Sequence, residues 1–183
     1  MPRIKTQLKD MELKDLNKPE TLIVYNKEAE AFSFETLGYE NFIEERDVRN
    51  RKTRTVKTNS AKECKLTFDT GRSAGTQLTV YTSENTKFLV YQPTAKELLE
   101  RSERPLSLET VVDPFKKVEN YKEVLAKDLN AGDFVMKYVS FNNRAKPMSV
   151  RLSAKESGEI KDYVEIKSIA DNFLVVDNFL IKY

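Results

Sequence analysis

The chain has no histidine and no tryptophan, and it contains a single cysteine, Cys64, among 183 residues. Histidine is the side chain whose charge changes near neutral pH without help, so catalytic triads built on it are excluded. One cysteine cannot form an intramolecular disulfide, and without histidine it cannot complete a zinc cluster. We therefore expect no metal site and no cofactor, and we expect Cys64 to be a small buried hydrophobic residue.

Glycine is also scarce, with five residues in the chain. Gly71 and Gly75 are separated by Arg-Ser-Ala and are not followed by Lys-Ser or Lys-Thr, so they predict a turn rather than a phosphate-binding loop. One enzyme hypothesis survives, because Glu165-Ile166-Lys167 has the Glu-x-Lys form of magnesium-dependent nucleases. The alternative is a solvated strand with Ile166 turned inward. We favour a protein that is not an enzyme.

Long apolar runs are absent as well. No stretch approaches the eighteen apolar residues of a membrane-spanning helix, and the most apolar segment, 173–183, is interrupted by Asp177 and Asn178. Residues 1–16 mix lysines with acidic residues and lack the apolar core of a signal peptide. These features predict a cytoplasmic protein without a membrane segment.

Alternation of apolar and polar side chains predicts a β-rich fold. The 1–18 segment fits an amphipathic helix or an edge strand, and both alternatives stay open. The expected strands cover residues 22–25, 31–34, 64–68, 77–81, 87–91, 134–141, 148–152, 163–169 and 173–183, the last of which folds back at Asp177-Asn178.

Two helix-start signals occur in the middle of the chain. Thr94 with Glu97 three residues later has the form of a capping box. Asp113-Pro114 precedes an apolar stripe at helical spacing, formed by Phe115, Val118, Tyr121 and Leu125. We therefore predict the α+β class, a single antiparallel β-rich domain over 1–183 with two helices inserted at 94–130.

The net charge of +2 hides an uneven distribution of charge. Residues 46–65 carry eight basic and two acidic side chains, and residues 137–155 carry five basic side chains and no acidic one. Two basic segments interrupted by Thr, Asn and Ser are typical of a surface that follows phosphates; a solvated loop is the alternative for 46–57. The predicted phosphate-binding residues are Arg46, Arg49, Arg51, Lys52, Arg54, Lys57, Lys137, Arg144, Lys146 and Arg151.

Four aromatic residues flank these basic segments: Tyr39, Phe42, Tyr138 and Phe141. Each is either a platform on which a base stacks or an ordinary core residue. Together with the basic segments they indicate a non-catalytic nucleic-acid-binding protein, with single-stranded DNA as the favoured partner.

Four short segments, Met11-Glu12-Leu13-Lys14, Phe32-Ser33-Phe34, 49–55 and 162–167, resemble small accessory proteins of Gram-positive integrative and conjugative elements. That family is linked to helicase processivity and relaxase assistance. The resemblance implies a β-rich domain that binds single-stranded DNA beside a helicase or relaxase encoded by a mobile element, although 94–130 has no counterpart in the family. A different hypothesis is a phage or mobile-element inhibitor, of the anti-defence or anti-CRISPR type, that binds a host protein or nucleoprotein.

Overall fold

The computed structural model describes residues 3–7, 9–16, 18–69, 77–92, 110–111, 121–141, 144–166 and 171–182. The described residues form strands connected by turns, loops and three short 3-10 helices. In the first half of the chain these are β1 (Arg3–Lys5), β2 (Asp10–Glu12), η1 (Leu13–Asp15), β3 (Thr21–Asn26), β4 (Ala31–Thr36), η2 (Tyr39–Asn41), β5 (Phe42–Arg46), β6 (Lys52–Val56), β7 (Thr58–Asp69), β8 (Gln77–Ser83) and β9 (Lys87–Tyr91). In the second half they are β10 (Thr110–Val111), β11 (Tyr121–Leu125), η4 (Ala126–Asp128), β12 (Phe134–Phe141), β13 (Arg144–Val164), β14 (Phe173–Val176) and β15 (Phe179–Lys182).

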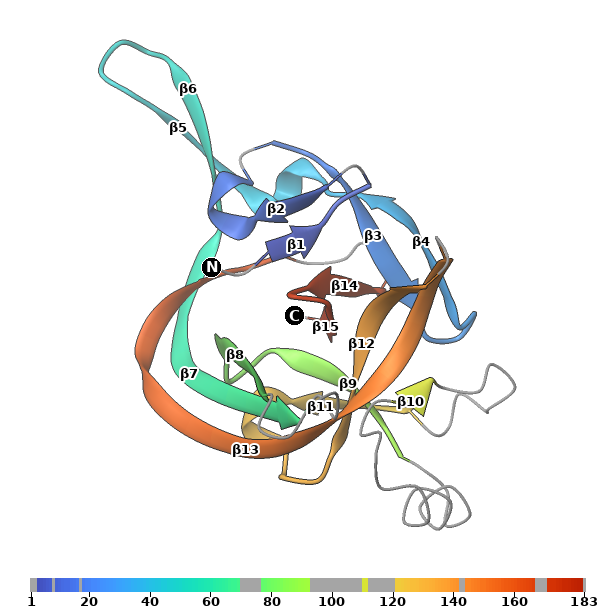
Figure 1. The fold of residues 1–183 in the computed structure, drawn as a ribbon. Coiled ribbons are helices and arrows are strands. Elements are labelled where there is room, and N and C mark those ends of the chain that lie inside the picture. Colours follow the sequence, from blue (N-terminus) through green and yellow to red (C-terminus); the bar gives the residue numbers. More distant parts are fainter. Residues whose placement is uncertain are drawn as a thin grey trace, which may run out of the picture.

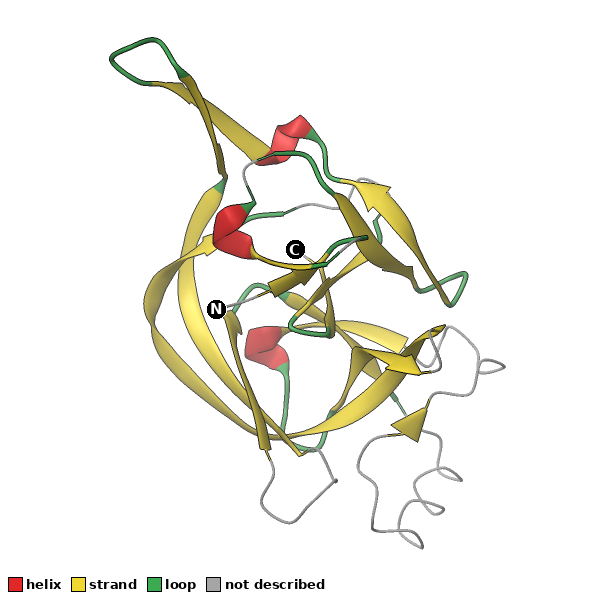
Figure 2. Cartoon of the chain, turned by 45° about the horizontal axis from the view of Figure 1, so that its top comes forward, coloured by secondary structure: helices red, strands yellow, loops and turns green. Residues whose placement is uncertain are grey.

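The predicted α+β class is wrong, because the described chain is nearly all antiparallel β-sheet and holds no helix of seven or more residues (Figure 2). Residues 121–125, which we expected in the second helix, form strand β11 instead, and β11 pairs with β9 from Tyr121↔Tyr91 to Leu125↔Lys87. The Tyr121 ring packs 5.5 Å from that of Tyr91 inside the core, so tertiary pairing overrides the helical spacing. Residues 93–109 and 112–120, including the first expected helix, lie outside the described part.

Thirteen of the described strands join in one sheet, in the order β2-β1-β14-β15-β9-β12-β13-β7-β8, with β3, β4, β10 and β11 attached beside this path. Figure 1 shows the sheet curling round on itself, with β7 and β13 sweeping along one side and β14 and β15 near the middle. Strands β5 and β6 form a separate two-stranded sheet. No helix in the described residues is long and apolar enough to cross a membrane.

The longest strand is β13, with 21 residues, and it pairs with β12 over its first part and with β7 over the rest. Its register with β7 shifts between Leu152 and Ala154 and again between Ser157 and Ile160. Such bulges bend a strand and increase its twist, which accounts for the curved path of the β7–β13 pair. Gly158 lies at the second shift, where an added Cβ would approach the Cβ of Glu63 to 3.3 Å.

The core lies on both faces of the central strands. Every residue of β14 is buried, and so is every residue of β9 except the first, Lys87, which is partly exposed. In β9, Phe88 and Val90 enter one hydrophobic cluster while Leu89 and Tyr91 enter another. Burial on both faces explains why these strands are continuous apolar runs in the sequence rather than alternating ones.

The two ends of the chain meet in the sheet. Ile4 of β1 pairs with Val176 of β14, and residues 1–18, left open between helix and strand, contain the antiparallel pair β1–β2. The predicted fold-back at Asp177-Asn178 is confirmed: φ is 50° at Asp177 and 66° at Asn178, the left-handed values that a type I′ hairpin turn requires.

Candidate nucleic-acid interface

Residues 42–56 form a β-hairpin, here termed the arm, that projects from the body of the protein (Figure 1). Strands β5 and β6 pair at five positions, from Phe42↔Val56 at the base to Arg46↔Lys52 near the tip. Phe42 is 8% exposed and belongs to the core cluster that also holds Leu37 and Ile166, and Val56 packs against the same cluster. The basic segment is therefore a paired ribbon anchored in the core, rather than a loop.

One carboxylate organises the tip of the arm. The Asp47 Oδ1 accepts the backbone N–H groups of Arg49 and Arg51, both at 2.9 Å, and its Oδ2 accepts the Arg51 Nε at 2.9 Å. The backbone N–H of Arg51 does most to hold the pKa of Asp47 below its ordinary value of 3.8, and Arg49 and the Arg51 guanidinium act in the same direction. Asn50 closes the turn with φ at 59°.

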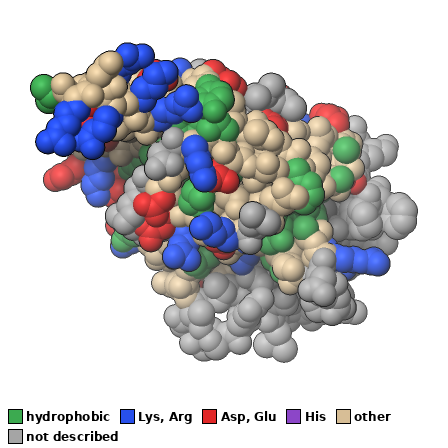
Figure 3. Space-filling view, turned by 90° about the horizontal axis from the view of Figure 1, so that it is seen from above, with side chains coloured by type: hydrophobic (Ala, Val, Ile, Leu, Met, Phe, Trp, Pro, Cys, Tyr) green, Lys and Arg blue, Asp and Glu red, His purple; other side chains and the backbone are tan. Residues whose placement is uncertain are grey.

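The two faces of the arm differ in charge. Cross-strand pairing places Glu44 opposite Arg54 and Arg46 opposite Lys52 on one face. The pairs Ile43↔Thr55 and Glu45↔Thr53 alternate with these and occupy the other face, which has no basic residue. The first face is here termed the basic face. Figure 3 shows Lys and Arg side chains gathered on the arm.

The basic side chains of the arm differ in how far they are paired. Lys52 and Arg54 share the carboxylate of Glu44, at 3.3 and 3.7 Å, and Arg46 donates to the Asn50 side chain at 3.0 Å. Arg49 and Lys57 are exposed, and within the described residues their side chains make no hydrogen bond or ion pair. Residues 42–57 carry six basic and three acidic side chains, a net charge of +3.

The structure places the predicted aromatic residues in different surroundings. Tyr39 of η2 is 60% exposed, and the Arg54 guanidinium lies over its ring, with Cζ 4.3 Å from the centroid. Phe42 is a core residue. The half-buried Tyr138 ring meets the edge of Phe32, with 5.2 Å between centroids, and lies under the Lys5 ammonium at 4.8 Å. The side chain of Phe141 is outside the described part.

The second predicted basic segment does not join the arm. Arg144 is the first residue of β13, whereas Val164, the last, pairs with Thr58 at the base of the arm. The two groups therefore lie at opposite ends of the longest strand (Figure 1). Pairing of β12 with β13 places Lys137, Arg144 and Lys146 on one face of the sheet and Arg151 on the other.

Two residues of the arm were missed as functional candidates. In the sequence, Asp47 enters only the charge count, as an acidic residue within a basic segment, whereas in the structure its carboxylate orders the tip. The Asp-x-x-Asn spacing of Asp47 and Asn50 is typical of a turn and could have indicated this role. Val48, beside it, is fully exposed at 106%, an apolar side chain at the end of a basic ribbon.

The nuclease pattern gains no support from its surroundings. Ile166 is 5% exposed and enters the core, and the Glu165 backbone N–H donates to the Lys57 carbonyl at 2.7 Å, while Lys167 lies outside the described residues. Among residues that the structure describes, no group of three or more acidic or cysteine side chains could hold a metal ion.

Comparisons of the chain with protein-family models, with curated proteins and with solved structures give no match.

Proposed function

We propose that this protein binds nucleic acid without catalysing a reaction on it, and that it does so by placing the arm in a groove of duplex DNA. The observation that supports the proposal best is the one-sided charge of the arm, with Arg46, Lys52 and Arg54 on one face and none on the other. Basic side chains on a projecting element neutralise phosphates and release the cations that surround DNA.

The dimensions of the arm suit a groove. The major groove of B-DNA is about 12 Å wide and about 8.5 Å deep, and it admits a two-stranded β-ribbon. Five paired residues at about 3.3 Å each give a ribbon about 17 Å long, so the tip reaches the groove floor while the base stays outside. Val48 and Arg49 at the tip would then meet base edges, the valine through apolar contact with thymine methyl groups.

The ion pairs on the arm do not oppose this role. The carboxylate of Glu44 and the side chains of Lys52 and Arg54 are all partly exposed, and exposed pairs of this kind contribute little to stability. A phosphate can therefore replace Glu44 as the partner of either cation at small cost. Among the described residues, the Arg49 side chain has no carboxylate partner that a phosphate would have to replace.

The aromatic residues that flank the basic segments in the sequence favour single-stranded DNA as the partner. Of those residues, Phe42 is buried and Tyr39 already carries Arg54 on its ring, which weakens the case for a row of stacking platforms. We therefore place duplex DNA first. As an accessory DNA-binding protein of a mobile element, the chain would act in the cytoplasm beside the enzymes that process that DNA.

Fluorescence anisotropy with a labelled duplex, and with one of its strands alone, tests the proposal. Duplex affinity should fall steeply as salt rises from about 50 to about 200 mM, and Arg49→Gln and Lys52→Gln should each reduce the slope of log affinity against log salt by about 0.9. The matched control is Thr55→Glu, which lowers the arm charge by the same single unit from the opposite face. Its slope should equal that of the unchanged protein.

Four results would count against the proposal. The protein could fail to bind any oligonucleotide at about 50 mM salt, where non-specific attraction is strong. Thr55→Glu could reduce the slope as much as Lys52→Gln, which would show that the basic face has no special role. Tighter binding to the single strand than to the duplex would overturn the choice of partner. Co-purification with one host protein after nuclease treatment, without DNA binding, would favour the inhibitor hypothesis.

A further inference from the structure

Strand β8 has one edge that no other described strand covers. It pairs with β7 at seven positions, from Gln77↔Asp69 to Ser83↔Glu63. In the described part of the chain no backbone group of residues 78–82 has a partner on the opposite side. An open edge presents a row of unused N–H and C=O groups to any extended chain that reaches it.

In natural proteins, edge strands usually contain a lysine, a proline or a β-bulge that prevents pairing with a strand of another molecule. None of these devices occurs in β8, which is Gln-Leu-Thr-Val-Tyr-Thr-Ser and so lacks any charged residue or proline, in a chain of which 33% is charged. Its leucine, valine, threonines and tyrosine are residues that favour strands. The composition is that of a strand with a neighbour on both sides.

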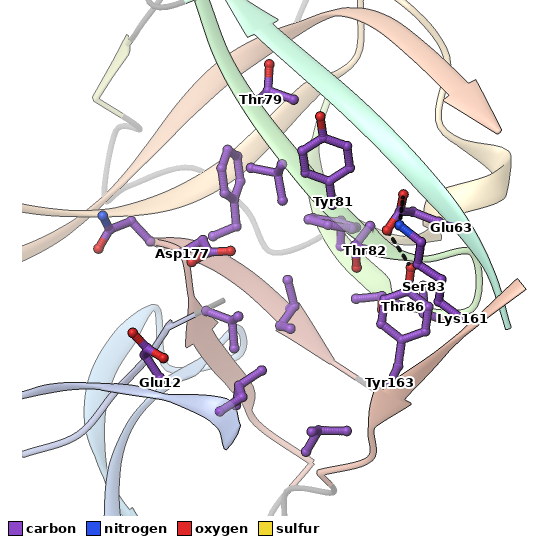
Figure 4. A pocket seen from close by; sticks show the side chains of 18 of the residues that line it. Glu12, Glu63, Thr79, Tyr81, Thr82, Ser83, Thr86, Lys161, Tyr163 and Asp177 are labelled. Carbon is purple, nitrogen blue, oxygen red and sulfur yellow. Dashed lines mark hydrogen bonds and ion pairs between the residues drawn. The ribbon is translucent and has the colours of Figure 1, made fainter. Parts of the chain in front are cut away.

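The open edge lines a cleft of about 830 Å³ (Figure 4). Across the cleft lie Glu12 and Leu13, the turn that joins β14 to β15, and residues 161–164 at the end of β13. Phe88, Phe179 and Ile181 contribute apolar surface between these walls. The edge is therefore recessed, and its partner has to enter beside an apolar surface.

A single strand suits the cleft better than a second copy of the protein. A second copy that paired through its own β8 would bring its β7 as a further strand into the space lined by Glu12, Leu13 and the β14–β15 turn. An extended peptide lies about 4.8 Å from the edge strand and needs about 3.3 Å for each residue. Seven residues of peptide would cover the whole of β8.

Charge indicates the kind of peptide. Among the described residues, the cleft is lined by four acidic side chains, Glu12, Glu63, Asp162 and Asp177, and by one base, Lys161. Glu63 contacts that lysine at 3.1 Å and accepts the Tyr163 hydroxyl at 3.2 Å (Figure 4), and Arg3 lies 4.0 Å from Glu12 at the rim. Even with Arg3 counted, the described residues of the walls carry an excess of two negative charges, opposite in sign to the arm.

We infer that the edge of β8 binds an extended basic peptide segment of a partner protein by β-strand addition. The backbone of the peptide pairs with residues 78–82, and its lysine or arginine side chains meet the acidic walls of the cleft. The cleft and the arm are formed by different strands, so peptide binding at β8 can be tested independently of nucleic-acid binding by the arm.

The test uses a labelled heptapeptide that alternates lysine with valine, and a second peptide with glutamate in place of lysine. The lysine peptide should bind and the glutamate peptide should not. Thr79 is exposed and lines the cleft, so Thr79→Lys should weaken the lysine peptide about fivefold through repulsion, whereas Thr79→Glu should not weaken it. The thermal midpoints of the two variants show whether both remain folded.

Hydrogen exchange locates the contact. The lysine peptide should slow exchange at alternate amides of residues 78–82, and Arg49→Gln in the arm should leave peptide affinity unchanged. The inference is overturned if neither peptide binds at about 1 mM, if both bind equally, or if protection appears outside β8. Protection of β8 that depends on protein concentration without peptide would show a second copy on the edge, which also overturns it.

Discussion

The guanidinium carbon of Arg54 lies 4.3 Å from the centroid of the Tyr39 ring, which ties strand β6 of the arm to the 3-10 helix η2 at its base. An exposed cation–π contact of this kind contributes about 0.5–1 kcal/mol. A contact that weak adds little to folding, but it connects the arm to the body next to its base. We therefore expect Tyr39 to act as a brace that limits the movement of the arm, with one face of its ring covered by Arg54.

Tyr39→Ala should leave the free energy of unfolding within about 1 kcal/mol of the original and should make the arm more mobile, because the brace is lost. The measurement is backbone NMR relaxation of residues 43–55, compared with that of β7. Tyr39→Phe keeps the ring and is the matched control. Unchanged relaxation in Tyr39→Ala would contradict the bracing role.

Val48→Ala should weaken duplex binding by about 1–2 kcal/mol if the tip is covered in the complex, because two methyl groups no longer leave water. The slope of log affinity against log salt should stay the same, since no charge changes. Ile43, 45% exposed on the other face of the arm, provides the control Ile43→Ala. Equal losses for the two substitutions would show that the tip is not the contact.

Acid should loosen the tip of the arm. The backbone N–H of Arg51 is the main cause of the lowered pKa of Asp47. The ionised carboxylate therefore stabilises the tip fully at pH values above 3.8, the ordinary pKa of an aspartate. This stabilisation is lost as the pH falls through the lowered pKa. An NMR titration of the Asp47 carboxyl should have its midpoint below 3.8, and the Arg49 and Arg51 amides should exchange faster below that midpoint. Asp47→Asn keeps an acceptor without the charge, so its tip should lose this pH dependence. A midpoint at or above 3.8 would contradict the assignment.

Leu152→Ala should lower the free energy of unfolding by about 2–5 kcal/mol, because Leu152 is fully buried in the cluster between β7, β12 and β13. Arg151→Ala, at the exposed neighbouring position, should change it by no more than about 0.5 kcal/mol. Urea denaturation measures both values. Similar values for the two variants would show that the sheet face assigned to each residue is wrong.

Local patterns predicted the parts of the fold that local chemistry determines. The pair β3–β4 and the turn at Asp177-Asn178 follow from alternating side chains and from residues that tolerate positive φ. Strand β13 could not be predicted at its full length, because its 21 residues include Pro147, Gly158 and many charged side chains. Its extended conformation is determined by pairing with β12 and β7, and pairing at long range leaves no local signal.

The candidate site could be predicted only in part, because its geometry also depends on the pairing of strands. The charge count found the basic residues of the arm but could not show that 42–56 is a paired ribbon with one basic face, since register depends on which residues of β5 oppose those of β6. Nor could composition show that β8 lies beside a cleft, or that the aromatic Phe42 is part of the core while Tyr39 is exposed.

The pairing of Ile4 with Val176 sets an order of events during synthesis. The edge that receives β1 and β3 belongs to β14, which is synthesised after both of them and after the strands between, so the amino-terminal strands have no partner there until β14 emerges from the ribosome. Sheets that depend on such distant contacts form slowly, and their unpaired strands are exposed to aggregation and proteolysis meanwhile. The two amino-terminal strands therefore stay unpaired at this edge until β14 has been synthesised, however early they leave the ribosome.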